Sequence, residues 1–235
     1  MTRRKIVFII VEGPSDESAL GVLMGRLYDK AVVHVEIMHC DITTEYGVNP
    51  TNIVAKLGNT IKKYAGQIYK PSDFVRIIHI TDMDGAFIPD HAIIEDVTAE
   101  KTSYDVTSIR TQNKSAIADR NRRKRENLSR LSSINRIWKI PYRIYYMSCN
   151  LDHALYNKLN SSNREKEDDA RAFAKKYMDN IPDFVRFIRE AAFCDIQNYD
   201  ESWDYIREAC HSLERHTNFG LCLENRNNEA ESNVT

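Results

Sequence analysis

The chain has 235 residues, 42% of them hydrophobic and 29% charged, and its formal net charge is −1, as is typical of a soluble globular protein. No apolar stretch approaches the roughly 20 residues of a membrane span, and no signal peptide is expected, so we expect a cytoplasmic protein without membrane contact. The near-zero net charge means that any affinity for nucleic acid must come from a local cluster. The five cysteines lack CxxC spacing, which indicates reduced thiols and excludes a disulfide framework or a zinc site.

Strand-like and helix-like segments alternate along the first two thirds of the chain. A buried strand is predicted over residues 5–11, followed by a helix with Ser15 or Asp16 as its N-cap. Two further strands over residues 32–38 and 74–80 flank a second helix, and residues 142–147 form the fourth strand. This order predicts an α/β fold in which helices cover both faces of a parallel four-stranded sheet.

Two regions fall outside this alternation. Residues 86–139 are too long for a usual connection between strands, and their polar part, residues 114–136, is predicted to be helical. After a core domain over residues 1–155, three helical patterns predict a helical extension over residues 156–223. The Asn/Glu/Ser-rich residues 224–235 are predicted to be a disordered tail.

Three carboxylates follow two of the predicted strands. Glu12 comes directly after the first strand and precedes Gly13, and Asp82 and Asp84 come after the third strand and precede Gly85. Because parallel strands place their carboxyl ends at one sheet edge, these acids should lie close together, where oxygen ligands suit a hard cation. The alternative is structural, since an aspartate can cap the following turn and Glu12 can be an exposed acid at the end of a strand.

These residues carry a resemblance to a known family. Val11-Glu12-Gly13-x-x-Asp16 after the first strand, with Asp82-x-Asp84-Gly85 after the third, resembles the TOPRIM domain of topoisomerases, primases, ribosomal-RNA maturases and OLD-family nucleases. The resemblance covers roughly residues 4–155. It implies a TOPRIM-like sheet in which Glu12, Asp82 and Asp84 are catalytic and bind Mg²⁺, with Mn²⁺ as a substitute.

Two further acids are candidates for an additional metal ligand. Asp16 resembles an extra carboxylate of the OLD-like branch, although N-capping of a helix explains it equally well. Asp152 opens a helix after the last core strand, as a glutamate does in TOPRIM proteins of bacterial phage defence, and the alternative is an N-cap formed by Asn150 or Asp152. His153 is interpreted as a structural neighbour, because Mg²⁺ prefers oxygen.

Cations gather within the insertion, against only Asp119 and Glu126. Such a cluster can follow a phosphate backbone, and the lack of aromatic residues within it favours contacts that depend weakly on base sequence. The alternative is a solvated helix or loop. The residues predicted to contact nucleic acid are Lys114, Arg120, Arg122, Arg123, Lys124 and Arg125.

Together these patterns favour a Mg²⁺-dependent endonuclease that cleaves DNA or RNA, such as tRNA, and the resemblance implies an effector of bacterial antiviral defence. The alternatives are a ribosomal-RNA maturase-like processing enzyme and a non-cleaving regulatory subunit that docks through Phe184, Phe187 and Trp203. The chain contains no GxxxxGK[ST] loop, so we expect it to act alone, as a homo-oligomer, or with a separate ATPase partner.

Overall fold

The computed structural model describes residues 4–194 and 198–224 and has a mixed α/β architecture built on a mostly parallel sheet. The four predicted strands are present and pair in parallel, in the order β2-β1-β3-β8. Two short strands, β7 and β9, pair with β8 in the antiparallel sense, so the sheet has six strands rather than the predicted four. The strands are β1 (Lys5–Val11), β2 (Val33–His39), β3 (Phe74–Asp82), β7 (Arg136–Ile137), β8 (Ile140–Ser148) and β9 (His216–Thr217).

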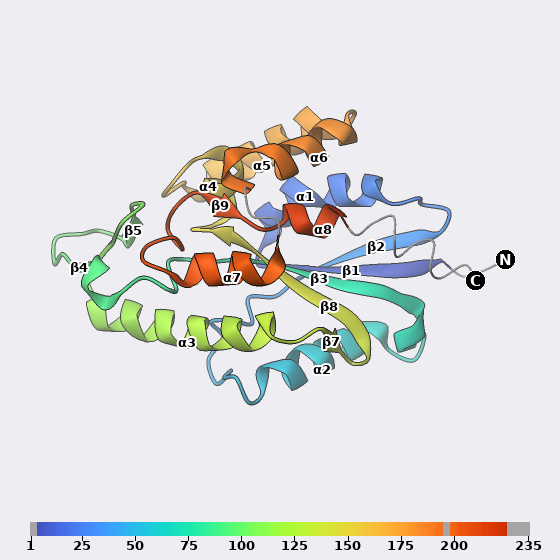
Figure 1. Ribbon diagram of the computed structural model, residues 1–235, viewed down its shortest axis with the longest axis horizontal. Coiled ribbons are helices and arrows are strands. Elements are labelled where there is room, and N and C mark those ends of the chain that lie inside the picture. The colour runs from blue at the N-terminus through green and yellow to red at the C-terminus, as the bar shows by residue number, and fades with distance from the viewer. Residues whose placement is uncertain (1–3, 195–197, 225–235) are drawn as a thin grey trace.

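Helices cover both faces of this sheet, as the alternating pattern predicts (Figure 1). One layer contains α1 (Pro14–Leu27), α5 (Asn163–Tyr177) and α6 (Ile181–Glu190). The opposite layer contains α2 (Ile53–Ala65) and α3 (Lys114–Ser132). Within the described residues, no helix is both long and apolar enough to cross a membrane.

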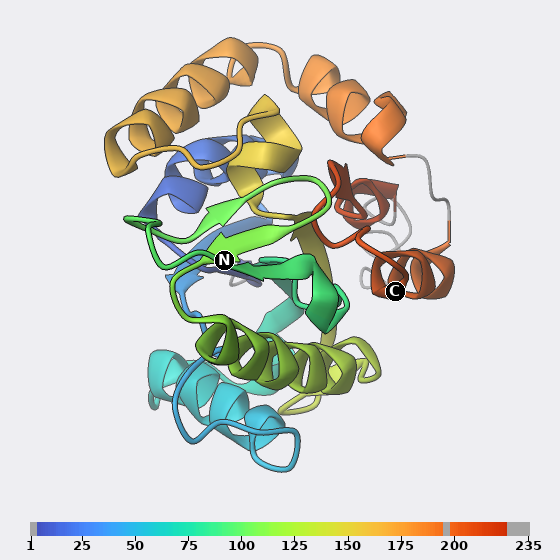
Figure 2. The same cartoon turned by 90° about the vertical axis from the view of Figure 1, so that its left-hand side faces the viewer.

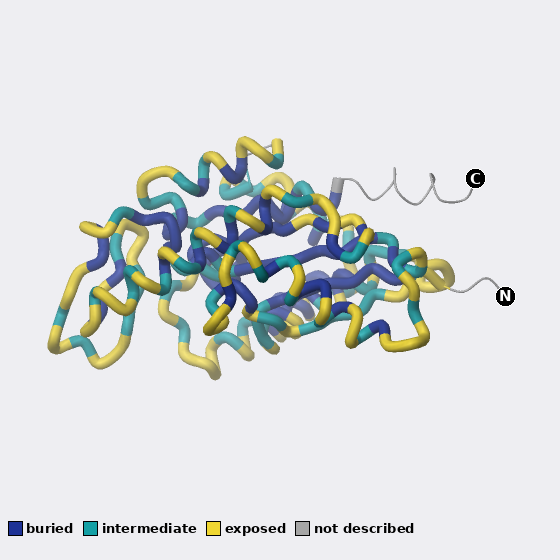
Figure 3. The backbone as a smooth tube through the Cα atoms, turned by 90° about the horizontal axis from the view of Figure 1, so that it is seen from below, coloured by how far each residue is buried: buried dark blue, intermediate teal, exposed yellow. Residues whose placement is uncertain are grey.

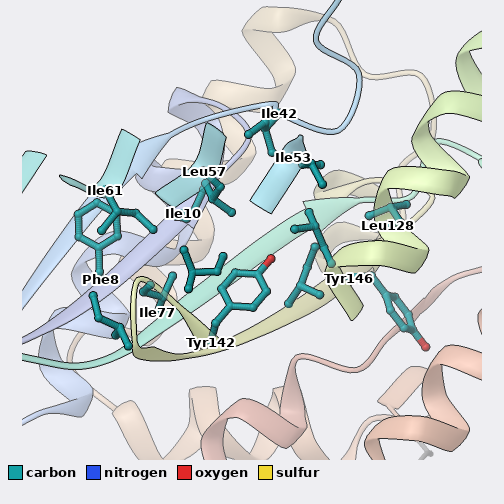
Figure 4. Packing of buried hydrophobic residues seen from close by; sticks show 14 of the residues in the cluster. Phe8, Ile10, Ile42, Ile53, Leu57, Ile61, Ile77, Leu128, Tyr142 and Tyr146 are labelled. Carbon is teal, nitrogen blue, oxygen red and sulfur yellow. The ribbon is translucent and has the colours of Figure 1, made fainter. Parts of the chain in front are cut away.

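Two hydrophobic cores lie on the two faces of the sheet, and the side chains of β1 alternate between them. Ile6, Phe8 and Ile10 face the α2–α3 side, whereas Val7 and Ile9 face the α1 side. Successive residues of a strand point to opposite faces, so a strand covered on both sides is apolar throughout. Figure 3 shows the strands as the buried centre of the chain, and Figure 4 shows the packing around Phe8 and Ile10.

The C-terminal part of the chain packs into these same cores. Trp203 and Ile206 belong to the cluster that contains Phe8, and β9 extends the main sheet. The predicted extension is therefore not purely helical and is not set apart from the sheet. The spacing of Trp203, Ile206, Cys210 and Leu213 predicts one helix here, but α7 ends at Arg207 and Leu213 lies in a turn. The remaining helices are α4 (Leu151–Tyr156), α7 (Tyr199–Arg207) and α8 (Gly220–Glu224), with 3-10 turns at Pro71–Asp73, Asp90–Ala92 and Ala192–Cys194.

The insertion between β3 and β8 contains a small second sheet that the sequence patterns do not predict. Its strands are β4 (Ile93–Glu95), β5 (Ser103–Tyr104) and β6 (Ile109–Thr111), in the order β4-β6-β5. This sheet lies beside α3 at the end of the molecule that faces the viewer in Figure 2. Residues 225–235, most of the predicted disordered tail, lie outside the described residues.

Candidate active site at the carboxyl edge of the sheet

The ends of β1 and β3 bring Glu12 and Asp82 together. The two strands are paired with Ile10 opposite His79, so Glu12 lies beside Thr81. Glu12 Oε1 accepts hydrogen bonds from Thr81 Oγ1 at 2.6 Å and from the Asp82 backbone N–H at 3.0 Å. The side chain of Glu12 is therefore held at the sheet edge by the neighbouring strand, as its position after a buried strand predicts.

A tight loop carries Asp84 past the end of β3. Asp84 and Gly85 have positive φ angles of 48° and 67°, a region that glycine adopts readily and other residues rarely do. The Asp84 N–H donates to the Cys149 carbonyl at 2.6 Å. From α3, Arg120 Nη2 donates to the carbonyl of Asp84 at 2.7 Å, and Asn121 Nδ2 donates to that of Gly85 at 3.0 Å. These bonds offset the cost of the strained backbone.

Lys124 lies inside the carboxylate cluster and not on the surface of α3. Its side chain is 0% exposed, and its ammonium group lies 2.5 Å from Asp84 Oδ2 and 3.3 Å from Glu12 Oε1. Burying a lysine is tolerated when its charge is paired in this way. The Lys124 side chain was expected to contact nucleic acid, but it is buried and is not accessible for such a contact. Lys124 belongs to the carboxylate site instead.

Asp16 and Asp152 lie next to the same edge. Asp16 is in the first turn of α1 and accepts a hydrogen bond from the Gly13 N–H at 3.0 Å, and Gly13, rather than Ser15 or Asp16, is the N-cap of this helix. Asn150 caps α4, which leaves the Asp152 side chain to pair with Lys166 at 3.3 Å.

The cluster carries more negative charge than its cations neutralise. Burial raises the pKa of Glu12 to about 7, despite the opposing effect of Lys124. Burial and the neighbouring charges of Glu12, Asp16 and Asp84 raise the pKa of Asp82 well above its usual value. Burial also favours the neutral form of Asp84, but Lys124 and Arg120 outweigh it and lower the pKa of that group. Such perturbed carboxylates are typical of functional sites.

Burial likewise raises the pKa of the two flanking acids. For Asp16 the nearby charge of Asp152 adds to the effect, although the N–H of Gly13 opposes it. For Asp152 the ammonium group of Lys166 opposes it. A cluster of acids with raised pKa values is stabilised when a cation binds, because the added positive charge favours the ionised carboxylates.

The chemistry of these donors fits a hard divalent cation, because every candidate ligand is a carboxylate oxygen. A ready coordination geometry is not formed: in the described part of the chain, no group of three or more His, Cys, Asp or Glu side chains is arranged to hold a metal ion. The ammonium group of Lys124 is the cation placed between Glu12 and Asp84. The residues that could hold a cation are Glu12, Asp16, Asp82, Asp84 and Asp152.

The basic residues of α3 divide between two faces of the helix. Arg120 and Lys124 face the site, where Arg120 also donates to the Tyr104 hydroxyl at 2.7 Å. Arg122 is exposed, with an ion pair to Asp119 at 3.1 Å. Of the predicted nucleic-acid contacts only Lys124 is buried, and those that remain at least partly accessible to solvent are Lys114, Arg120, Arg122, Arg123 and Arg125.

Sequence patterns alone missed three parts of this site. The sequence patterns single out neither Thr81 nor Lys166, and they assign Lys124 to nucleic-acid contact instead of to the site. Thr81 and Lys166 carry no local signal, because their roles depend on contacts with residues far away in the sequence. Lys124 did carry a local signal, since it lies four residues before Leu128 on the same helical face, and Leu128 is completely buried.

Comparison with known proteins adds no relative. The chain matches no protein-family model, and searches of curated proteins and of solved structures find no match. The TOPRIM resemblance therefore depends on the two acidic motifs and the order of the strands, and function has to be argued from the site itself.

Proposed function

We propose that this protein is a Mg²⁺-dependent endonuclease with a TOPRIM-like core. The observation that carries the proposal is the pairing of Glu12 with Asp82 at the carboxyl edge of the parallel sheet, in a cluster that is short of positive charge. Ligands of open α/β folds bind at this edge. Hard oxygen donors beside a helix with exposed arginines suit a phosphodiester substrate and a divalent cation.

The residues of the site have distinct proposed roles. The raised pKa of Glu12, about 7, suits a group that accepts a proton from water near neutral pH. The Thr81 hydroxyl and the Asp82 N–H keep the Glu12 carboxylate in place during this transfer. Asp82, with Asp16 and Asp152 beside it, would hold Mg²⁺, or Mn²⁺ in its place, and the family resemblance adds Asp84 to these ligands. The chemistry that this cation supplies when bound is activation of water and neutralisation of charge on the phosphate.

The accessible cations of α3 would hold the nucleic acid. The same helix carries Arg120 and Lys124 into the site, so the element that would bind the nucleic acid also borders the carboxylates. Contacts of this kind bind the phosphate backbone and leave DNA and RNA both possible as substrates. The resemblance supports an antiviral effector in the cytoplasm, acting alone, as a homo-oligomer or with a separate ATPase.

The two alternatives differ in how they relate to the site. A ribosomal-RNA maturase-like enzyme would use the same carboxylates and differ in its substrate. A non-cleaving subunit was expected to dock through Phe184, Phe187 and Trp203, but Phe184 is 0% exposed and Trp203 is 2% exposed. These two side chains pack inside the protein, and of the three residues only Phe187 remains partly accessible for docking.

Cleavage of a mixed DNA and RNA panel with Mg²⁺ or Mn²⁺ tests the proposal. Asp82→Asn should abolish cleavage because it removes charge from the centre of the cluster while keeping the shape of the side chain. Asp168→Asn is the matched control, since the Asp168 side chain is 64% exposed and lies on α5. Cleavage by Asp82→Asn at the wild-type rate would refute the nuclease assignment.

A further inference from the structure

One face of α3 contacts the site. Arg120 and Asn121 bind the backbone carbonyls of the Asp84 loop, and Lys124 pairs with the side chain of Asp84. One turn later, Asn127 Nδ2 donates to the Thr43 carbonyl at 2.9 Å, in the loop that follows β2. Lys124 is therefore held in the middle of a buried, hydrogen-bonded helix face. Its ammonium group cannot leave the cluster unless the helix or its long side chain is rearranged.

The contacts of Lys124 divide the carboxylates into two groups. Asp84 is neutralised by a fixed cation, and Glu12 Oε1 shares the same ammonium group. Asp82 and Asp16 instead accept backbone N–H groups, from Leu151 at 3.0 Å and from Gly13 at 3.0 Å. In the part of the chain that the structure describes, neither Asp82 nor Asp16 is within ion-pair distance of a lysine or arginine. The unneutralised charge thus lies on the Asp82 side of the site.

We infer that the site binds a single divalent cation through Asp82, with Asp16 and Glu12 beside it. Lys124 supplies the second positive charge of the site and neutralises the Asp84 carboxylate. This inference deepens the proposed function and depends on it. The role of metal ligand that the family resemblance implies for Asp84 passes to Asp82 and its neighbours.

A second cation at Asp84 is disfavoured by electrostatics. It would have to displace Lys124, which would leave a desolvated ammonium group without its closest partner. It would also lie near Arg120, which already binds the Asp84 carbonyl. A cation at Asp82 leaves the pair between Lys124 and Asp84 intact, and it adds positive charge where no lysine or arginine of the described residues lies within ion-pair distance of Asp82.

Titration of the full chain with Mn²⁺, followed by electron paramagnetic resonance, counts the bound ions and measures their affinity. The wild-type protein should bind one Mn²⁺ ion. Asp82→Asn should weaken binding by more than about 100-fold, beyond what removal of a residue that only orients a ligand costs. The double variant Asp84→Asn/Lys124→Met removes both charges of this pair together, so that neither of the two is left buried without the other. It should still bind one ion, with affinity lowered by less than about tenfold.

The possible outcomes separate this inference from the proposed function. Two tightly bound ions in the wild-type protein, or loss of binding in the double variant as severe as in Asp82→Asn, would overturn the inference and leave the nuclease proposal standing. No Mn²⁺ binding by the wild-type protein would overturn both. The wild-type count decides the question even if the double variant does not fold, and the thermal unfolding midpoint of each variant shows whether it does.

Discussion

Glu12 combines three properties that make its ionisation sensitive to pH near neutrality. Its side chain is largely buried, with 14% exposed. The carboxylate accepts hydrogen bonds from two neutral donors, and it shares the ammonium group of Lys124 with Asp84. Burial is the largest cause of its raised pKa of about 7, against 4.5 for an ordinary glutamate. Below pH 7 the carboxyl group is therefore mostly protonated, and a cation that needs its charge has to displace a proton.

Mn²⁺ affinity should consequently rise with pH through the range in which Glu12 ionises. Each proton released on binding changes the affinity about tenfold per pH unit below the pKa of Glu12. Titration at pH 6 and at pH 8 should show this difference, and Glu12→Gln should reduce it, because the amide has no proton to lose in this range. Equal wild-type affinities at the two pH values would show that Glu12 does not contribute its charge to the cation.

The positions of Glu12 and Asp82 could be predicted from the sequence, whereas the role of Lys124 was not. A carboxylate directly after a buried strand is placed at the sheet edge by the strand itself, without reference to the rest of the chain. The partner of Lys124 is set by how α3 packs onto the sheet, and a charge within a run of arginines usually indicates exposure. Only its helical spacing from Leu128 and Leu131 pointed to the buried face.

At the scale of one element, α3 separates two functions on opposite faces. Its buried face holds the Asp84 loop through Arg120 and Asn121, and its exposed face presents Arg122. Changes on the exposed face should therefore weaken binding of nucleic acid and leave the fold intact, because surface substitutions rarely change stability by more than about 0.5 kcal/mol.

The double variant Arg122→Gln/Arg125→Gln should bind a labelled oligonucleotide more weakly than the wild-type protein. The slope of log affinity against log salt should fall by about 0.7–0.9 for each phosphate that the variant no longer neutralises. Lys62→Gln/Lys63→Gln removes the same charge from the exposed end of α2 and is the matched control. An equal decrease of affinity in both double variants would indicate nonspecific attraction and not a track along α3.

Long buried elements were predictable, and short ones were not. The continuous apolar run of β1, and the run of β3 that only Arg76 and His79 interrupt, indicate strands covered on both faces. The spacing of Ile53, Leu57 and Ile61 indicates α2. The small sheet was missed because β5 has two residues and β4 and β6 have three each, too few to show a period. Similarly, β9 exists because its two residues pair with the end of β8.

At the scale of the whole molecule, the C-terminal region shares a core with the sheet. Trp203 packs edge-on against Tyr146 of β8 with ring centroids 5.3 Å apart, and both side chains are almost completely buried. The Asp84 loop also depends on this region, since the Gly85 N–H donates to the Ser212 carbonyl at 3.2 Å. The chain should therefore unfold as one cooperative unit, although the sequence suggested a core with an extension.

Trp203→Ala should destabilise the protein by about 3–5 kcal/mol, because it opens a large cavity between α7 and β8. Denaturant unfolding, followed by circular dichroism, should show a single transition moved to lower denaturant. Tyr46→Ala is the control, because Tyr46 is 92% exposed and its removal should change stability by less than about 0.5 kcal/mol. Two separate transitions, with only one affected by Trp203→Ala, would show that the C-terminal region is an independent unit.

Anomalous diffraction from crystals soaked in Mn²⁺ locates a bound ion directly. We expect one peak within coordination distance of the Asp82 carboxylate at the carboxyl edge of the sheet, with Lys124 still paired with Asp84. No peak at this edge, in crystals of a folded protein that has taken up Mn²⁺ elsewhere, would contradict the assignment of the carboxylate cluster as a metal site.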